Sequence, residues 1–239
     1  MKKTKWLILG ATFLGCSFAV LKNDCVILEE GCNIGNEFVS AFNQKKPIPF
    51  NLKTSKANSF LNSLKEDGLV TESGEIYSQP AVFKLASLLV KKETEIHFDT
   101  VVLEIKKQNN GFLVEYSNCD GINTIFAENI LDTTSVGTIL KHDRKAYLSV
   151  AAENGEITNE ITKMSYFFVE YEKDFITTRE SAYKKAKKNN FKVIMTADRL
   201  CYLNEIKPFC QDLINYAPSD GFYNLIYAFE GGVLLAEEL

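Results

Sequence analysis

The first thirty residues alternate between apolar runs and short breaks, in an order that predicts a strand, a turn, a helix and a second strand. Trp6 to Leu9 is a short apolar run, the turn over 10–15 holds two glycines, and residues 16–21 are again mostly apolar. After a polar break, residues 25–28 form a second apolar run that ends in two glutamates. Short apolar runs bounded by glycine or polar residues are typical of strands buried in a parallel sheet. We therefore predict a parallel βαβ unit at the start of the chain.

The pattern further along predicts an α/β fold with an added hairpin. Apolar residues at helical spacing predict an amphipathic helix over 80–92, and the next residues predict a strand over 95–105. Residues 112–116 and 124–132 predict hairpin strands that interrupt the alternation of helices and strands. We expect a Rossmann-like βαβ domain with an inserted β-hairpin.

Two segments predict additions to this domain, which we assign to residues 1–140 and 217–239. Residues 43–77 hold a polar loop, a helix near 55–66 and a turn into a short hairpin, and they are a candidate cap insertion. A small α+β cap domain is predicted over 141–216. Its expected elements are a strand over 165–172, a helix over 178–189, a strand over 192–196 and a helix over 204–215.

Composition and charge narrow the functional classes. The chain has 239 residues, 46% of them hydrophobic, and a net charge of −4. An acidic balance argues against binding to nucleic acid or to an anionic membrane. Six cysteines without a CxxC pair, together with two histidines, predict no structural zinc site and no other metal site.

The N-terminus admits a second interpretation, that of a bacterial lipoprotein signal. Lys2, Lys3 and Lys5 precede the apolar run, and a small residue, Gly15, stands before Cys16. A signal peptide gives no reason for a second apolar strand that ends in acid after a polar break. We therefore favour the βαβ interpretation, and we expect a cytoplasmic protein.

The glycine turn has the residues that a dinucleotide-binding unit needs. Gly10-x-Thr12-x-x-Gly15 provides two glycines where the backbone turns tightly and comes close to a pyrophosphate. The helix that follows offers free N–H groups to phosphates. Glu29 comes 19 residues after Gly10, near the spacing of about 20 expected for an acid that binds ribose hydroxyls. This motif alone is also compatible with a turn that binds no ligand.

Three further segments carry a resemblance to a known family. They are the stretch from Val26 to Gly35, the helix and strand around Val102, and the strand leading to Asp132-Thr-Thr-Ser-Val-Gly137. With the segment from Gly221 to Ala236, they resemble the FAD-dependent oxidoreductases that have a glutathione-reductase-type flavin domain.

This resemblance implies that FAD is the cofactor. In the family, the valine matched by Val102 presents its backbone to the adenine, and the closing helix meets the pyrimidine edge of the flavin. Thr12 and Ser135 stand where the family has glycine, so retained, weakened and lost FAD binding all stay open. The implied cofactor-binding residues are Gly10, Thr12, Phe13, Leu14, Gly15, Glu29, Glu30, Val102, Thr133, Thr134, Ser135, Gly221, Phe222, Tyr223 and Asn224.

The resemblance further implies an oxidoreductase whose flavin takes a hydride or two electrons from a small organic substrate, such as an amine, an amino acid or a hydroxy acid. The alternative is a flavoprotein-like subunit that binds FAD without catalysis, or not at all, and acts through a partner protein. The small cap and the missing catalytic base favour this alternative. A homo-oligomer is a further possibility, whereas nucleic acid and membrane are not expected partners.

The sequence indicates catalytic and substrate-binding residues less clearly than cofactor-binding ones. His142 is a weak candidate base because histidine titrates near neutral pH and this residue lies where the chain enters the cap. The charged segment around it, residues 141–145, is more simply a solvated connector. The three arginines, Arg144, Arg179 and Arg199, all fall in the cap segment. Their planar guanidinium groups suit carboxylate recognition, and they are our candidate substrate contacts.

Overall fold

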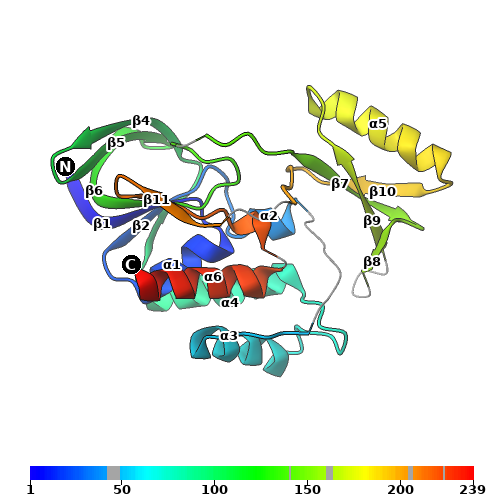
Figure 1. The fold of residues 1–239 in the computed structure, drawn as a ribbon, viewed down its shortest axis with the longest axis horizontal. Helices are drawn as coiled ribbons and strands as arrows, with labels where there is room; N and C mark the ends of the chain where they lie inside the picture. Colours follow the sequence, from blue (N-terminus) through cyan, green and yellow to red (C-terminus); the bar gives the residue numbers. More distant parts are fainter. Residues whose placement is uncertain (42–48, 140, 160–163, 204–206, 223) are drawn as a thin grey trace.

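The computed structural model describes residues 1–41, 49–139, 141–159, 164–203, 207–222 and 224–239 (Figure 1). Two sheets organise these residues, a larger one on the left of Figure 1 and a smaller one on the right. The polar loop expected at the start of the 43–77 segment falls largely on 42–48, outside the described residues, as does Tyr223.

The larger sheet confirms the predicted βαβ unit. β1 (Lys2–Leu9) lies between β2 (Cys25–Leu28) and β6 (Gly121–Asp132), and both pairings are parallel. β3 (Glu95–His97) and β12 (Ile214–Tyr216) extend this parallel core on its two sides. β1 is buried on both faces, because Trp6 and Ile8 join one apolar cluster and Leu7 and Leu9 join another. This two-sided burial explains why its sequence is a continuous apolar run.

Antiparallel strands complete the larger sheet. β4 (Val101–Gln108) and β5 (Gly111–Asn118) form the predicted hairpin, and β5 pairs with the first half of β6. β11 (Phe209–Gln211) pairs with β12 at the edge. The α/β fold class, with its parallel sheet and added hairpin, is therefore confirmed.

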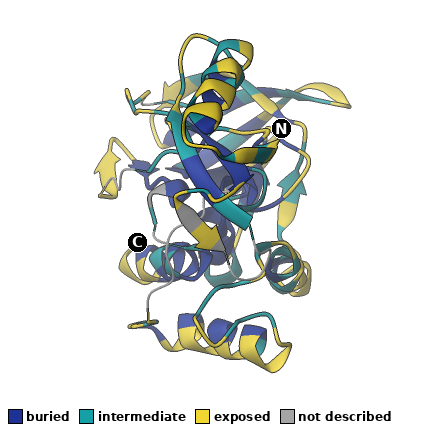
Figure 2. Ribbon diagram, turned by 90° about the vertical axis from the view of Figure 1, so that its right-hand side faces the viewer, coloured by how far each residue is buried: buried dark blue, intermediate teal, exposed yellow. Residues whose placement is uncertain are grey.

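Helices cover one face of the larger sheet, and the hairpin covers the other (Figure 1). α1 (Phe13–Leu21), α4 (Ser78–Lys91) and α6 (Leu225–Glu238) lie against the sheet. α3 (Ser55–Glu66) forms a further layer on α6, with an exposed outer face (Figure 2). Its bounds agree with the predicted helix near 55–66.

The smaller sheet has the strand order β10-β7-β9-β8, and every pairing in it is antiparallel. Its strands are β7 (Tyr147–Glu153), β8 (Ile157–Asn159), β9 (Met164–Glu170) and β10 (Lys192–Thr196). α5 (Phe175–Lys188) packs on one face around an apolar cluster that includes Leu148 and Phe167. Two short helices, α2 (Asn36–Val39) and η1 (Ser219–Gly221), lie between the two sheets (Figure 1).

Three predicted elements were wrong in part. The helix predicted over 204–215 is instead the hairpin of β11 and β12, whose turn places Asp212 and Leu213 at positive φ. β12 pairs with β6 and β11 pairs with β12, so residues 209–216 belong to the larger sheet, although they fall in the predicted cap segment. The strand predicted over 95–105 is two strands, β3 and β4, which are separated at Asp99 with φ 49°. β3 pairs with β2, whereas β4 pairs with β5. α1 begins at Phe13, because the side chain of the preceding threonine caps it three residues earlier than predicted.

Within the described ranges, we find no helix that is both long and apolar enough to cross a membrane.

Candidate functional site

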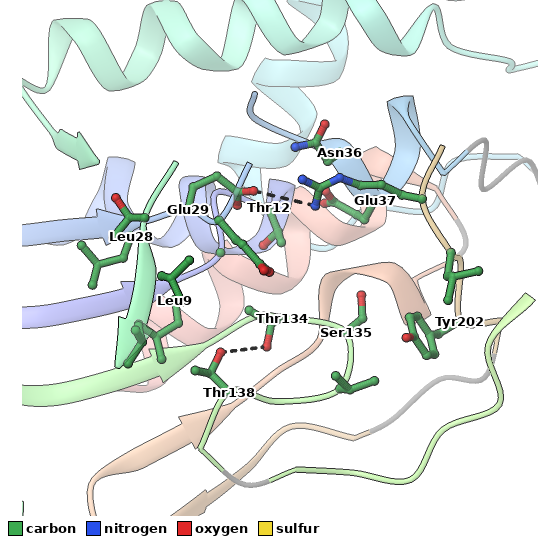
Figure 3. Close-up of a pocket in the computed structure, with 18 of the residues that line it drawn as sticks. Leu9, Thr12, Leu28, Glu29, Asn36, Glu37, Thr134, Ser135, Thr138 and Tyr202 are labelled. Carbon is green, nitrogen blue, oxygen red and sulfur yellow. Dashed lines mark hydrogen bonds and ion pairs between the residues drawn. The ribbon is translucent and has the colours of Figure 1, made fainter. Parts of the chain in front are cut away.

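A cavity of about 690 Å³ opens at the carboxyl ends of the parallel strands β1, β2 and β6. Open α/β sheets bind ligands in this position, where neighbouring loops diverge. One wall comes from the ends of β1 and β2 and from α2, and the opposite wall comes from the loop after β6 (Figure 3). Phe175 at the start of α5 and four residues that follow β10, Asp198, Arg199, Leu200 and Tyr202, close the cavity on the side of the smaller sheet.

The turn after β1 needs both of its glycines. Gly10 has φ 93°, and a Cβ on Gly15 would lie 2.8 Å from the carbonyl oxygen of Gly10. Thr12, where the family pattern has glycine, is the N-cap of α1, and its hydroxyl oxygen accepts from the N–H of Gly15 at 3.1 Å. The same hydroxyl donates to Thr133 at 2.7 Å. Thr12 therefore ties the turn to the end of β6.

Glu29 is held in the cavity wall by two backbone N–H groups. Its Oε2 accepts from Ala11 at 2.7 Å, and its Oε1 accepts from Gly31 at 2.8 Å. The guanidinium of Arg199 comes to 4.0 Å from Oε1 of Glu29. Each carboxylate oxygen can accept further hydrogen bonds, so a ligand's hydroxyl groups could still bind there.

Glu37 is a second buried acid in this wall, and it lies at the N-terminus of α1. Its Oε1 accepts from the N–H of Phe13 at 2.8 Å and from the hydroxyl of Ser219 at 2.8 Å. Burial raises the pKa of Glu37 to about 7, and the nearby charge of Glu29 adds to this rise. The hydrogen bonds from Phe13 and Ser219 oppose it. The carboxyl group is therefore present in both protonation states near neutral pH.

The wall opposite Glu37 is shaped by Asp132, the last residue of β6. Asp132 accepts from the N–H and hydroxyl groups of Thr134 and from the N–H of Thr138, which folds the 133–139 loop back on the strand. Burial raises the pKa of Asp132. The loop presents Thr134, Ser135 and Thr138 to the cavity (Figure 3).

The structure brings about half of the predicted cofactor residues together at this cavity. Those that line it are Gly10, Thr12, Glu29, Glu30, Val102, Thr134 and Ser135. Phe13, Leu14, Gly15 and Thr133 lie just behind the turn and are not among its lining residues. Gly221, Phe222 and Asn224 are likewise not among them, and Asn224 caps α6 by accepting from the N–H groups of Ile226 and Tyr227.

The candidate catalytic and substrate residues are scattered. Arg199 lines the cavity, whereas Arg179 lies over the ring of Phe175 and donates to Thr196. Arg144 is buried and forms an ion pair with Asp220 at 2.8 Å. His142 stacks on Tyr216 with ring centroids 4.3 Å apart and is not a lining residue.

Sequence reasoning missed Asn36, Glu37 and the cap residues at the cavity other than Arg199. A usable signal for Glu37 was present: it stands two residues after the glycine of the family pattern, in the apolar setting of Phe38 and Val39. No local signal marks Asp198, Leu200 or Tyr202, because the smaller sheet brings them to the cavity from a distant part of the chain.

We predict that the Glu37→Gln variant loses a pH dependence of stability that the original protein has. Because the pKa of Glu37 is raised in the folded chain, its contribution to stability is full below the ordinary glutamate pKa and falls as pH rises through about 7. Glutamine keeps an oxygen that accepts from Phe13 but carries no charge. Thermal unfolding from about pH 5 to about pH 8 measures this. Curves that fall in parallel for both proteins would contradict the assignment.

Comparisons with known proteins support the fold. No protein-family model matches the chain, and no curated protein is similar to it in sequence. Among solved structures, it is similar to p-nitrophenol 4-monooxygenase from Pseudomonas putida, with a TM-score of 0.62 and 12% identity, covering 99% of this chain and 78% of that one. A geranylgeranyl bacteriochlorophyll reductase-like protein from Thermoplasma acidophilum is similar as well, with a TM-score of 0.62 and 12% identity, covering 99% of this chain and 78% of that one.

Anhydrotetracycline hydroxylase from Streptomyces rimosus is a third similar structure, with a TM-score of 0.62 and 9% identity, covering 98% of this chain. The chain spans 61% of the length of that hydroxylase. These likenesses extend over nearly the whole chain, smaller sheet included. The chain therefore has the α/β fold seen in this monooxygenase, this hydroxylase and this reductase-like protein.

Proposed function

We propose that the cavity binds FAD and that the protein is a cytoplasmic FAD-dependent oxidoreductase. The observation that carries the proposal is the placement of Glu29. Its carboxylate is fixed at the end of β2 by two N–H groups and faces a cavity that Gly10 and Val102 also line. An acid at this point of a βαβ unit is suited to ribose hydroxyl groups. The shared fold supports the same proposal.

The residues present fit the adenosine half of FAD. Glu29 would accept from the ribose, and Val102 on β4 would lie beside the adenine. Gly10 and Gly15 place no side chain at the two tightest points of the turn, and the hydroxyl of Thr12 between them is already engaged with Gly15 and Thr133. When bound, the flavin supplies the redox chemistry, as the acceptor of a hydride or two electrons.

The proposed substrate is a small organic molecule of the amine, amino acid or hydroxy acid class. Arg199 supports a substrate with a carboxylate, because a guanidinium binds carboxylates in a planar, bidentate way. The side chains of Phe175, Leu200 and Tyr202 around it provide an apolar surface for the remainder of such a molecule.

The visible absorption spectrum of the purified protein, with chromatography of the released cofactor, tests the cofactor directly. We expect the two visible bands of oxidised flavin and FAD in the supernatant. Bleaching of these bands by candidate substrates under anaerobic conditions would then identify the substrate class. A colourless protein that also fails to bind added FAD would exclude the proposed activity.

We predict that Glu29→Gln weakens FAD binding about tenfold or more, which corresponds to about 1.4 kcal/mol. The amide can accept only at one of its two positions, so one of the N–H groups of Ala11 and Gly31 loses its acceptor and the ribose loses a charged partner. Titration of the apoprotein with FAD, followed by flavin fluorescence, measures the change. Glu72→Gln, an exposed acid in a turn away from the cavity, is the control. Equal affinities in the two variants would argue against the ribose role.

A specific observation keeps a second function in view, that of a flavoprotein-like subunit that acts through a partner protein. The titratable side chains lining the cavity are Glu29, Glu30, Glu37, Asp198, Arg199 and Tyr202, and no histidine is among them. His142, the candidate base, is instead packed against Tyr216. Tight FAD binding without bleaching by any tested substrate would favour this function over catalysis.

A further inference from the structure

The N–H groups at the start of α1 already have acceptors within the chain. The N–H of Phe13 donates to Glu37 at 2.8 Å, that of Leu14 to Ser219 at 3.3 Å and that of Gly15 to Thr12 at 3.1 Å. The first N–H groups of a helix have no partners within the helix, and in βαβ folds they are the groups that meet a ligand's phosphate. The position suited to a phosphate is therefore occupied by side chains.

The acceptor from Phe13 is a carboxylate, so an anion from the chain itself fills this position. Ser219 links the N-terminus of α1 to Glu37, because its hydroxyl accepts from the N–H of Leu14 and donates to Oε1 of Glu37. The third segment, η1, is far from α1 and α2 in sequence, since Glu37 and Ser219 are separated by 182 residues. The same Glu37 side chain also lines the cavity (Figure 3), which places it between the helix terminus and any ligand there.

The other negative charges around Glu37 make its surroundings unfavourable for a second anion. Glu29 faces it from the end of β2, and Cys16 of α1 is close enough for the two groups to influence each other. Glu30, Asp198 and Arg199 line the same cavity. On η1, Ser219 is neutral and Asp220 is paired with Arg144. From α4, the side chain of Val82 packs beside Gly35 at the start of α2. Among the described lining residues, one positive side chain thus stands beside four carboxylates, and only Asp198 has a second cation, Arg179, at 3.7 Å.

We propose that the Glu37 carboxylate is an internal substitute for the cofactor's phosphate, and that it must leave the N-terminus of α1 or lose its charge before a dinucleotide binds tightly. The proposal rests on the proposed function for the identity of the ligand. Two anions cannot share the few N–H groups of one helix terminus without strong repulsion. Glu37 thereby sets the affinity of the cavity for a phosphate-containing cofactor.

This arrangement makes cofactor affinity depend on pH in a defined direction. Burial raises the pKa of Glu37 to about 7, so below neutral pH the side chain is mostly an uncharged acid. Above neutral pH it is a carboxylate that competes with the phosphates. We therefore expect FAD to bind more weakly at about pH 8 than at about pH 6.

The test compares two single-charge variants, Glu37→Gln and Asp198→Asn. Both remove one negative charge from the cavity wall, but only Glu37 contacts the N-terminus of α1. Two probes are titrated into each protein, FAD followed by fluorescence and inorganic pyrophosphate followed by the shift in unfolding temperature. We expect Glu37→Gln to bind both about tenfold more tightly at pH 8 and to lose the pH dependence. Asp198→Asn should show a much smaller change.

The outcomes separate this proposal from the proposed function. If the original protein binds FAD and Glu37→Gln binds it no better and with the same pH dependence, the role of Glu37 is wrong while FAD binding stands. If pyrophosphate stabilises Glu37→Gln more than the original protein but FAD binds to neither, the anion exchange holds and the cofactor is wrong. If neither probe binds any folded variant, both proposals are overturned. Circular dichroism of each variant establishes that it is folded.

Discussion

Replacing Arg144 by methionine is expected to destabilise the fold by about 3 to 5 kcal/mol, the usual result of removing one partner from a buried ion pair. The side chains of Arg144 and Asp220 are only 4% and 2% exposed, and they meet at 2.8 Å. Arg144 also donates to the backbone oxygen of Ser135 and lies over the ring of Tyr202 at 5.0 Å. Its loss leaves the buried Asp220 carboxylate without this cation and removes the contacts of Arg144 with Ser135 and Tyr202.

A neighbouring residue provides the control for this prediction. The side chain of Lys145 is 64% exposed and forms an ion pair with Glu170 at 3.3 Å. Surface pairs contribute little, so Lys145→Met should change the free energy of unfolding by no more than about 0.5 kcal/mol. Urea denaturation of both variants measures the difference. The double variant Arg144→Met, Asp220→Leu should regain much of the loss, because it leaves no buried charge. Similar small losses in Arg144→Met and Lys145→Met would show that the buried pair is not important for stability.

Replacing Gly35 by alanine is expected to cost about 2 to 5 kcal/mol, from backbone strain and steric overlap together. Gly35 has φ 70°, and a Cβ there would lie 2.6 Å from the ring of Phe13. Its N–H donates to the carbonyl oxygen of Ala11 at 2.9 Å, so it holds α2 against the turn before α1. The overlap would move α2 and with it Glu37, and we expect cofactor affinity to change as well.

Gly68 is a matched control for this variant. It has nearly the same backbone conformation, with φ 69°, but a Cβ there would meet nothing within 4 Å. Gly68→Ala should therefore cost only the strain of the left-handed conformation, about 1 kcal/mol. Thermal and urea unfolding of the two variants separate strain from overlap. Equal losses of unfolding free energy in the two variants would mean that Phe13 moves away from a Cβ at position 35 without a cost in stability.

Prediction from the sequence succeeded where a pattern was local. The strand over 25–28 and the helix over 55–66 have the predicted bounds, and the strand predicted over 6–9 is the second half of β1. Burial on both faces of a strand gives a continuous apolar run, and burial on one face of a helix gives a regular apolar spacing. It failed for residues 209–216, which are two short strands where a helix was expected. Three-residue strands are too short to show a period, and they become strands only because β12 pairs with β6 and β11 pairs with β12.

The sequence by itself determined the βαβ unit, its glycine turn and the acid after the second strand, because these features depend on residues within about thirty positions of one another. Tertiary structure decided what the turn contacts. Glu37 reaches the N-terminus of α1 together with Ser219, 182 residues away, and Arg144 meets Asp220, 76 residues away. Such pairs form when the two sheets and their helices pack, and no local pattern of residues encodes which buried acid will find which donor. The same packing carried the three arginines to three different surroundings, one of them the cavity.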